Sequence, residues 1–329
     1  MYDTPFHKED LSKLSFLVTG GCGFIGSNIV EYLLKYNAGK VVVFDNISTG
    51  FKKNIEPFLQ QKNFALIEGD IRNLDDCREA CKGIDYVNHQ AALGSVPRSV
   101  KDPVSTHSVN ATGFLNMLVA ARDAKVKRVV YASSSSVYGD HPVLPKKEDE
   151  TGNLLSPYAV TKKTNELYAR VFANTYHMEI IGLRYFNVFG PNQSPEGAYA
   201  AVIPLFMQAA ISKTAPFIDG DGEQTRDFTF VENAVQANIL SFFATRKEAL
   251  NQVYNVALGE KISVNHLYEV IASLGGSTVK PVHRETRAGD IRDSLADISK
   301  ISELIGYNPA IKVSEGLKIA FDWYRKNFS

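Results

Sequence analysis

The chain has 329 residues, 44% of them hydrophobic, which is enough for one large domain or two modest ones with a substantial buried core. Its 36 basic and 36 acidic residues give a formal net charge of zero, which excludes a global field that would recruit nucleic acid or an anionic membrane. Three cysteines are too few for a disulfide framework, and neither a run of about 18 apolar residues nor a signal-peptide pattern is seen, so we expect a cytoplasmic protein that binds neither nucleic acid nor membrane.

Short apolar runs rich in β-branched residues recur from residue 16 to residue 183, and helix-like segments separate them. The runs are Phe16–Thr19, Val41–Phe44, Ala65–Ile67, Tyr86–His89, Val129–Ala132 and Ile180–Leu183. This alternation predicts βαβ units and therefore an α/β fold, a Rossmann-type doubly wound parallel sheet covered by helices. Pro103–Lys125 and Pro157–Tyr176 are predicted to be long helices, each beginning at a proline. Cys77 and Cys81 lie one helical turn apart, and we expect them to pack in the core rather than to bind a metal.

The pattern changes after about Asn187, where loops rich in Gly, Pro and Asp alternate with shorter helices. We interpret residues 1–190 as the Rossmann domain and residues 191–329 as a smaller, mixed α/β substrate domain. Val253–Val256 is predicted to be one further strand that returns to the first sheet, so the Rossmann domain is expected to receive about 230–260 as well.

A glycine-rich turn follows the first predicted strand and leads into a helix. Gly20, Gly23 and Gly26 have the spacing G-x-x-G-x-x-G, with Phe24 and Ile25 at the start of the helix. The three glycines permit a tight turn, close approach to a pyrophosphate and close packing of helix on strand, and the helix N-terminus offers free N–H groups. The turn therefore indicates a dinucleotide site, although an ordinary strand-to-helix turn gives the same pattern.

Acidic residues end the next two predicted strands. Asp45, followed by Asn46, lies nineteen residues beyond Gly26, where a carboxylate can bond the ribose hydroxyls and would repel a 2′-phosphate, so NAD is favoured over NADP. Asp70, followed by Ile71, is placed either near the adenine amino group or in solvent at the end of the strand.

The candidate catalytic residues lie further along the chain. Tyr158 and Lys162 are four residues apart, on one face of a predicted helix. The neighbouring cation would favour the phenolate, so that Tyr158 can accept a proton from an alcohol. Ser134 and Ser135, in a serine cluster at the end of a strand, can bond the same alcohol oxygen. A surface tyrosine beside a solvated lysine, and a polar loop without a role, are the alternatives for these two motifs.

Together these motifs resemble the extended short-chain dehydrogenase/reductase family, and within it the nucleotide-sugar 4-epimerases. The resemblance covers nearly the whole chain, including Arg184–Asn187, Gly220–Gly222, Arg226–Phe228 and Arg287–Asp290. It implies an NAD-dependent isomerase in which Ser134 bonds the sugar and Lys162 also holds the nicotinamide ribose. It further implies that Asn110 and the loop from Ala91 to Leu93 line the cofactor. The residues that it implies for the uridine diphosphate are Asn187, Arg226, Arg287 and Asp290.

The family resemblance also suggests the reaction. A 4,6-dehydratase or a decarboxylase of UDP-glucuronate would carry a carboxylate within the segment that here reads Ser134-Ser135-Ser136, so 4-epimerisation through a 4-keto sugar is favoured. Ser294 takes the position that borders the sugar pocket in this family, where a small residue leaves room for a 2-acetamido group. Gly94, Ser95 and Gln193 can add hydrogen bonds to that amide.

We therefore expect interconversion of UDP-N-acetylglucosamine and UDP-N-acetylgalactosamine. Epimerisation of UDP-glucose and UDP-galactose, or of their uronic acids, is the alternative, and a non-catalytic NAD-sensing protein is a more remote one. Relatives commonly form homodimers through the two long helices, and we expect the same here. The apolar residues of those helices, such as Phe114, Leu118, Leu167 and Phe172, would otherwise face the protein's own core.

Overall fold

The computed structural model describes residues 1–196, 200–286 and 292–328. Its centre is a seven-stranded sheet of order β11-β6-β5-β4-β1-β2-β3, in which every neighbouring pair is parallel. Its strands are β1 (Ser15–Thr19), β2 (Lys40–Asp45), β3 (Phe64–Glu68), β4 (Tyr86–His89), β5 (Arg128–Ser134), β6 (Ile180–Tyr185) and β11 (Val253–Val256). This order confirms the predicted Rossmann-type fold.

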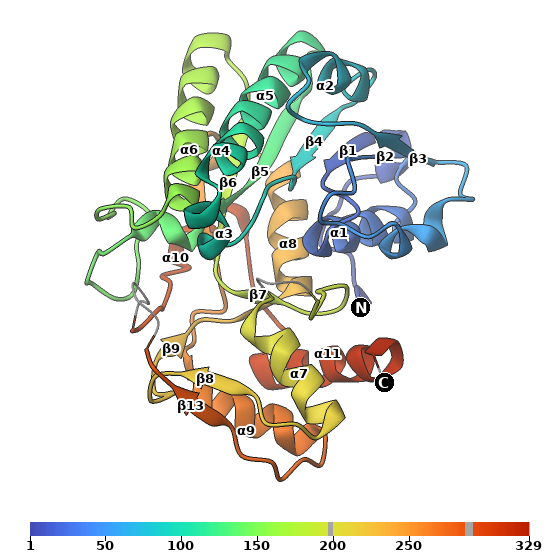
Figure 1. The fold of residues 1–329 in the computed structure, drawn as a ribbon. Helices are drawn as coiled ribbons and strands as arrows, with labels where there is room; N and C mark the ends of the chain where they lie inside the picture. Colours follow the sequence, from blue (N-terminus) through green and yellow to red (C-terminus); the bar gives the residue numbers. More distant parts are fainter. Residues whose placement is uncertain (197–199, 287–291, 329) are drawn as a thin grey trace.

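Most residues in the middle of the strands are apolar and buried because both faces of the sheet are covered by helices. On β1, Phe16 and Val18 belong to one buried cluster, whereas Leu17 between them belongs to the other. Helices α1 (Phe24–Lys35) and α8 (Val231–Phe242) cover the first face, and α2 (Leu74–Ala80), α5 (Gly113–Asp123) and α6 (Pro157–Tyr176) cover the second (Figure 1). Cys77 and Cys81 are buried in this second cluster.

The two long helices differ in regularity. Helix α6 has the predicted bounds, with Ser156 as its N-cap. The other predicted helix is one helical stretch in three parts that ends at Asp123, namely α4 (Pro103–His107), a π-helical turn (Ser108–Thr112) and α5. The short helix α3 (Val96–Lys101) precedes α4. The apolar residues Phe114, Leu118 and Phe172 face the protein's own core, and Leu167 is exposed.

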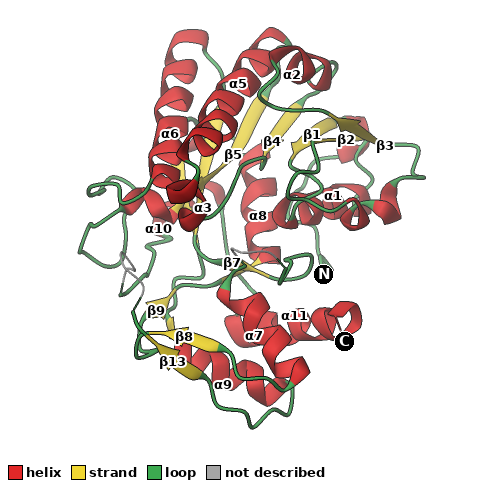
Figure 2. Ribbon diagram, viewed as in Figure 1, coloured by secondary structure: helices red, strands yellow, loops and turns green. Residues whose placement is uncertain are grey.

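A second group of elements lies at the end of the sheet where the strands finish (Figure 2). Helices α7 (Val202–Ser212), α9 (Val264–Leu274) and α11 (Val313–Phe328) share a separate apolar cluster. Three two-stranded pairs accompany them. They are β7 (Val188–Phe189) with β10 (Thr229–Phe230), β8 (Phe217–Asp219) with β13 (Val282–Arg284), and β9 (Thr225–Arg226) with β12 (Ile262–Ser263). The chain passes between the two groups several times, since α8, β11 and α10 (Ser299–Ile305) pack on the large sheet.

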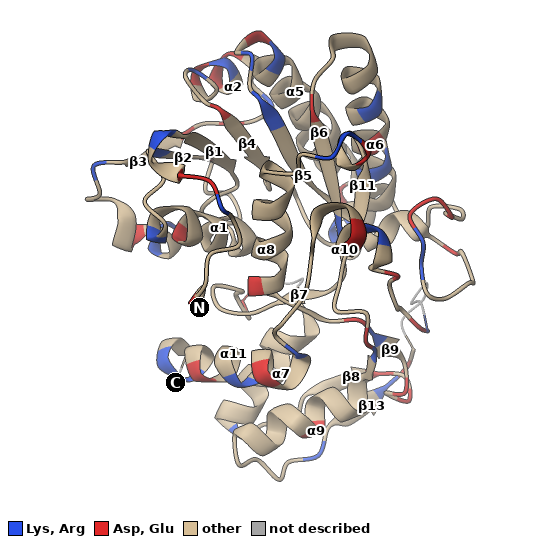
Figure 3. Cartoon of the chain, turned by 180° about the vertical axis from the view of Figure 1, so that it is seen from behind, with Lys and Arg blue, Asp and Glu red and all other residues tan. Residues whose placement is uncertain are grey.

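Short 3₁₀ helices complete the described chain at Leu11–Lys13, Lys52–Asn54, Glu56–Phe58, Ser135–Tyr138 and Lys247–Ala249. In the view of Figure 3, basic and acidic residues are interspersed over the helices and loops, as the zero net charge of the sequence suggests. None of the helices formed by the described residues is both long and apolar enough to cross a membrane.

Candidate active site

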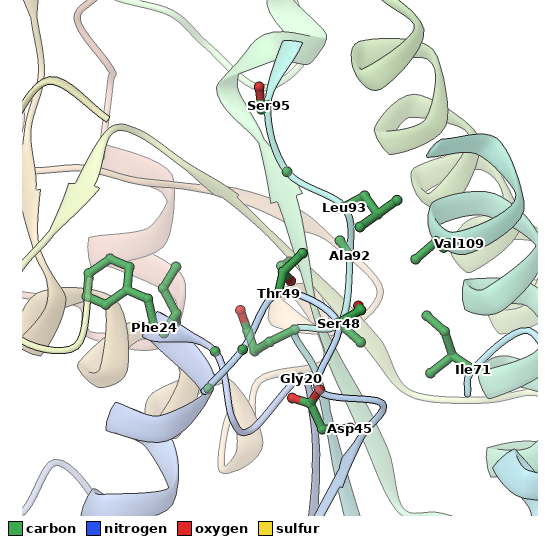
Figure 4. A pocket seen from close by; sticks show the side chains of 18 of the residues that line it. Gly20, Phe24, Asp45, Ser48, Thr49, Ile71, Ala92, Leu93, Ser95 and Val109 are labelled. Carbon is green, nitrogen blue, oxygen red and sulfur yellow. The ribbon is translucent and has the colours of Figure 1, made fainter. Parts of the chain in front are cut away.

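A cavity of about 520 Å³ opens where the strands of the large sheet end (Figure 4). In this view Phe24 lies on one side of the cavity and Ile71 and Val109 on the other, with Gly20 and Asp45 at one end and Ser95 at the other. The predicted site residues that line it are Gly20, Gly23, Phe24, Ile25, Gly26, Asp45, Asn46, Ile71, Ala91, Gly94, Ser95, Ser134, Tyr158, Lys162, Asn187 and Gln193. The structure therefore brings the predicted catalytic residues and most of the predicted cofactor-binding residues to one cavity.

The glycine turn is a close-packed corner. Gly20 has φ of +68°, and a Cβ there would lie 2.7 Å from the backbone nitrogen of Ala91. A Cβ on Gly26 would lie 2.2 Å from the carbonyl oxygen of Gly20, so the first turn of α1 rests directly on the end of β1. Gly23 is the N-cap residue of α1 and supplies no side chain, so no side-chain cap covers the N-terminus of this helix.

Asp45 is held in place by the backbone. Its Oδ2 accepts a hydrogen bond from the Cys22 N–H at 2.9 Å, and its Oδ1 accepts one from the Ile47 N–H at 2.8 Å. These bonds aim the carboxylate from the end of β2 across the glycine turn and leave its remaining lone pairs for a ligand.

Asp70 has a different environment. Arg72 binds its carboxylate, with the Arg72 Nη2 2.6 Å from the Asp70 Oδ2, and the Asn46 Nδ2 donates to the same oxygen at 3.0 Å. The Arg72 guanidinium lowers the pKa of Asp70 to about 2. Asp70 is not part of the cavity wall, whereas Ile71 beside it is. The carboxylate is therefore engaged by neighbours, one of which, Asn46, lines the cavity.

Asn110 lies behind the loop that lines the cavity. The Leu93 N–H donates to the Asn110 Oδ1 at 2.7 Å, and the Asn110 Nδ2 donates to the Leu93 carbonyl oxygen at 3.1 Å and to the Thr161 hydroxyl at 3.2 Å. Asn110 is buried and lies in the π-helical turn, so it supports the loop from Ala91 to Leu93 and ties it to α6.

Tyr158, Lys162 and Ser134 converge at the junction of α6 and β5. The Lys162 Nζ donates to the Ala132 carbonyl oxygen at 2.8 Å and lies 5.8 Å from the centre of the Tyr158 ring. Burial lowers the pKa of Lys162 to about 8. Burial also raises the pKa of Tyr158, and a hydrogen bond with the Ser134 side chain opposes that rise. In the protein alone, burial rather than Lys162 therefore dominates the pKa of Tyr158, which differs from the predicted lowering.

Two further residues of the cavity wall, Asn187 and Gln193, follow β6 and β7. The Asn187 Nδ2 donates to the Asp227 carbonyl oxygen at 2.9 Å, and the Gln193 Nε2 donates to the Val188 carbonyl oxygen at 3.2 Å. The Gln193 Oε1 is buried and has no hydrogen-bond partner among the described residues.

Arg226 and Ser294 lie close to each other, outside the wall of the cavity. The Arg226 Nη1 donates to the Thr225 carbonyl oxygen at 2.8 Å, and the Ser294 N–H donates to the same carbonyl group at 3.1 Å. Ser135, at the start of a 3₁₀ helix, is also outside the wall. Arg287 and Asp290 fall outside the described residues.

The nearby Asp227 fixes the segment that carries Ser294. Its carboxylate accepts hydrogen bonds from the backbone N–H groups of Leu258, Gly259 and Ala296 at 3.0, 3.1 and 3.2 Å. Burial raises the pKa of Asp227 to about 7, although the three donors oppose this rise.

Comparison with known proteins agrees with this site. Residues 16–257 match the model of the NAD dependent epimerase/dehydratase family. A putative UDP-glucose 4-epimerase from Methanocaldococcus jannaschii is 36% identical over 313 residues, covering 94% of this chain and 98% of the relative.

Two solved structures have nearly the same fold. A UDP-N-acetylglucosamine 4-epimerase from Methanobrevibacter ruminantium, in complex with UDP-N-acetylmuramic acid, is 40% identical with a TM-score of 0.90, covering 96% of this chain and 99% of that one. A UDP-glucuronic acid 4-epimerase from Bacillus cereus, in complex with UDP-glucuronic acid and NAD, is 30% identical with a TM-score of 0.88, covering 96% and 100%.

The chain belongs to the NAD dependent epimerase/dehydratase family. This membership confirms the family resemblance and the NAD cofactor, and it agrees with the predicted class of enzyme, an NAD-dependent nucleotide-sugar 4-epimerase. The residues present fit NAD, because one cavity contains an uncapped helix N-terminus, a fixed carboxylate at the end of β2 and the buried Lys162. The family's dinucleotide would be held along these groups.

Several cavity residues were not identified from the sequence. Ser48, Thr49 and Gly50 follow Asp45 in a polar loop, and their proximity to that strand end was the available signal. Gln90 gave no such signal, and Tyr185, although it lies in the segment Arg184–Asn187, was assigned no role, because the two residues meet only through the fold. The Gln90 Nε2 donates to the Tyr185 hydroxyl at 3.0 Å, joining β4 to β6.

Proposed function

We propose that this protein interconverts UDP-N-acetylglucosamine and UDP-N-acetylgalactosamine by inverting the configuration at C4 of the sugar. The observation that carries the choice of sugar is the similarity to a UDP-N-acetylglucosamine 4-epimerase, which is 40% identical and covers 96% of this chain. Gln193 lies in the cavity wall, where a side-chain amide can hydrogen-bond an acetamido group or a hydroxyl on the sugar.

Tyr158 acts as the base in the proposed mechanism. Its phenolate removes the proton of the sugar 4-hydroxyl, and the Ser134 hydroxyl hydrogen-bonds the same sugar oxygen and stabilises the phenolate. NAD, held in the same cavity, would supply the acceptor and then the donor of the hydride at C4. Tyr158 then gives back the proton to the oxygen of the 4-keto sugar, so atoms and electrons balance over the cycle without net oxidation.

Lys162 has two functions in this proposal. Its ammonium group, fixed by the Ala132 carbonyl oxygen, favours the phenolate of Tyr158 when that proton leaves. It also holds the nicotinamide ribose, in keeping with its place in the wall of the cavity.

The nucleotide is proposed to be held more firmly than the sugar. Asn187 and Arg226 would bind the uridine diphosphate, together with Arg287 and Asp290, which lie outside the described residues. A cation that binds a diphosphate by paired hydrogen bonds anchors one end of the substrate and leaves the sugar free to turn over between the two hydride transfers. Ser294 is proposed to border the space for the acetamido group.

We also propose a homodimer in the cytoplasm. Val100 and Val104 on α3 and α4, and Val160, Leu167 and Val171 on α6, are large apolar residues that the single chain leaves exposed. Helices α3 and α4 both contact α6, so these residues can form one apolar surface for a second copy.

The test of substrate choice is incubation of the purified protein with a panel of UDP-hexoses, with the products identified by NMR. We expect conversion of both N-acetylated sugars to the same equilibrium mixture, and much slower conversion of UDP-glucose, UDP-galactose and their uronic acids. Preference for a sugar without the acetamido group would contradict the choice of substrate but leave the class of reaction intact. The absence of turnover on the whole panel would favour the NAD-sensing alternative.

A further inference from the structure

A buried ion pair lies behind the catalytic residues. The Glu166 Oε1 accepts hydrogen bonds from the Ser133 hydroxyl at 2.7 Å and from the Arg184 Nε at 2.8 Å, and its Oε2 accepts one from the Arg184 Nη2 at 2.9 Å. The side chains of Glu166 and Arg184 are only 6% and 3% exposed. A charged pair this deeply buried contributes little net stability compared with apolar residues of the same volume, but its hydrogen bonds fix its geometry.

The pair joins the three elements that carry the active site. Glu166 follows Tyr158 and Lys162 at intervals of four residues on α6, so all three lie along one side of the helix. Ser133 immediately precedes Ser134 on β5, and Arg184 is its register partner on β6. The Glu166 carboxylate thus connects α6, which carries Tyr158, to β5, which carries Ser134.

The remaining contacts of the Glu166–Arg184 pair hold both side chains in place. Arg184 also donates from Nη1 to the Glu148 carbonyl oxygen at 2.8 Å, and its guanidinium lies 4.8 Å from the centre of the Tyr138 ring. Burial would raise the pKa of Glu166, but the hydrogen bonds and charge of Arg184, with the Ser133 hydroxyl, hold it below its ordinary value. The carboxylate therefore stays charged and fully engaged, and it does not itself reach the cavity.

We propose that Glu166 is a positioning residue that sets the separation of Tyr158 and Ser134 by tying α6 to β5 through Ser133. This proposal rests on the proposed function, because the separation matters only if Tyr158 transfers a proton while Ser134 bonds the same oxygen. Proton transfer depends steeply on such separations, so a small shift of α6 along β5 lowers turnover without removing any group that touches the substrate.

The test compares three variants of the full-length protein with bound NAD. Ser133→Ala removes the bond to β5 and leaves the Glu166–Arg184 pair intact. Because Ser133 also lines the cavity, an unchanged KM and an unchanged amount of bound NAD in this variant distinguish a loss of positioning from the loss of a ligand contact. Glu166→Asp keeps the charge on a shorter side chain, which cannot reach both Ser133 and Arg184. Lys163→Ala is the matched control, because the partly exposed Lys163 lies 3.6 Å from the Glu166 Oε2, without a hydrogen bond to it.

We expect kcat to fall roughly 10- to 100-fold in Ser133→Ala and Glu166→Asp, with KM for the UDP-sugar and the amount of bound NAD unchanged. The Ser134 bond opposes the raised pKa of Tyr158, so weakening it raises that pKa further. The base form then appears at higher pH, and the acidic limb of the profile of kcat against pH moves to higher pH. Lys163→Ala should stay within about twofold of the wild type.

Unchanged kcat and an unshifted pH profile in folded variants, with only a lower melting temperature, would show that Glu166 is purely structural and overturn the proposal. If Glu166→Asp does not fold, Ser133→Ala alone decides between these results, since it leaves the ion pair in place. The wild type is assayed in parallel on the UDP-hexose panel, so failure of the proposed function appears as absence of wild-type turnover and is distinct from failure of the positioning role.

Discussion

The side of the cavity proposed for NAD is built from the ends of strands in the large sheet, whereas much of the side proposed for the sugar is built from loops that follow them. Asp45 ends β2 and is fixed by two backbone N–H groups, and Gly20 packs against the backbone of Ala91. Gln193, in contrast, lies in a loop, with one end of its amide unpaired among the described residues. A firmly hydrogen-bonded cofactor side, and a sugar side with fewer internal hydrogen bonds, suit a reaction in which NAD stays bound and the sugar must turn over.

The largest expected effect is at Tyr158, where the two sides meet. Tyr158→Phe should retain NAD and bind UDP, because only the hydroxyl is lost, yet turnover should fall by about 10³-fold since proton transfer is removed. Turnover is measured by NMR, and bound NAD by its release on denaturation. Tyr176→Phe, an exposed tyrosine near the end of the same helix, is the control and should behave as the wild type. Near-normal rates in Tyr158→Phe would show that the base lies elsewhere.

The next expected effect is on the NAD side alone. The wild type should copurify with NAD, which is regenerated in every cycle and has no need to leave. In Gly26→Ala the new methyl group would lie 2.2 Å from the Gly20 carbonyl oxygen, so α1 must shift away from β1 at a cost of about 1–3 kcal/mol. We expect at least a tenfold weaker affinity for NAD, measured by titration of the NAD-free protein.

Gly83→Ala is the control for loss of stability, since Gly83 has φ of +65° with nothing within 4 Å of the added Cβ and lies outside the cavity wall. It should melt at a lower temperature yet keep its NAD. If Gly26→Ala also keeps its NAD, the contact of glycine turn and helix is not what forms the cofactor site.

The two sides also differ in how far the sequence predicts them. Gly20 directly follows β1, and Asp45 ends β2. Because the ends of neighbouring parallel strands lie at the same edge of a sheet, these two residues are predicted to lie together without knowledge of distant packing. Ser294 lies outside the cavity wall, and its position depends on how loops of the second group of elements pack, which no local pattern encodes. The Glu166–Arg184 pair required the register of β5 against β6, and the raised pKa of Tyr158 required its depth of burial.

A smaller effect is expected on the sugar side, and it concerns selectivity. Ser294→Tyr places a bulky ring where the acetamido group is proposed to fit, so kcat/KM for the N-acetylated sugars should fall about 10- to 100-fold more than that for UDP-galactose. The measurement is a comparison of both substrates with one enzyme preparation. Equal losses on both substrates, in a variant that still binds NAD, would show that Ser294 does not determine which sugar the site accepts.

The smallest effect on turnover is expected from separating the two copies of the proposed dimer. Val104 on α4 is 78% exposed and lies outside the cavity wall, so Val104→Glu adds a charge to the apolar surface of α3, α4 and α6 without altering either side of the cavity. Light scattering at micromolar concentration should give the mass of a dimer for the wild type and of a monomer for the variant, with turnover within about twofold. Val282→Glu, at an exposed valine on β13, is the matched control and should remain a dimer. A monomeric wild type would reject the dimer. A monomeric Val104→Glu variant without turnover would instead show that the active site depends on the dimer. Although one chain builds both sides of the cavity, a second copy would then be needed to hold α3 and α6 in place.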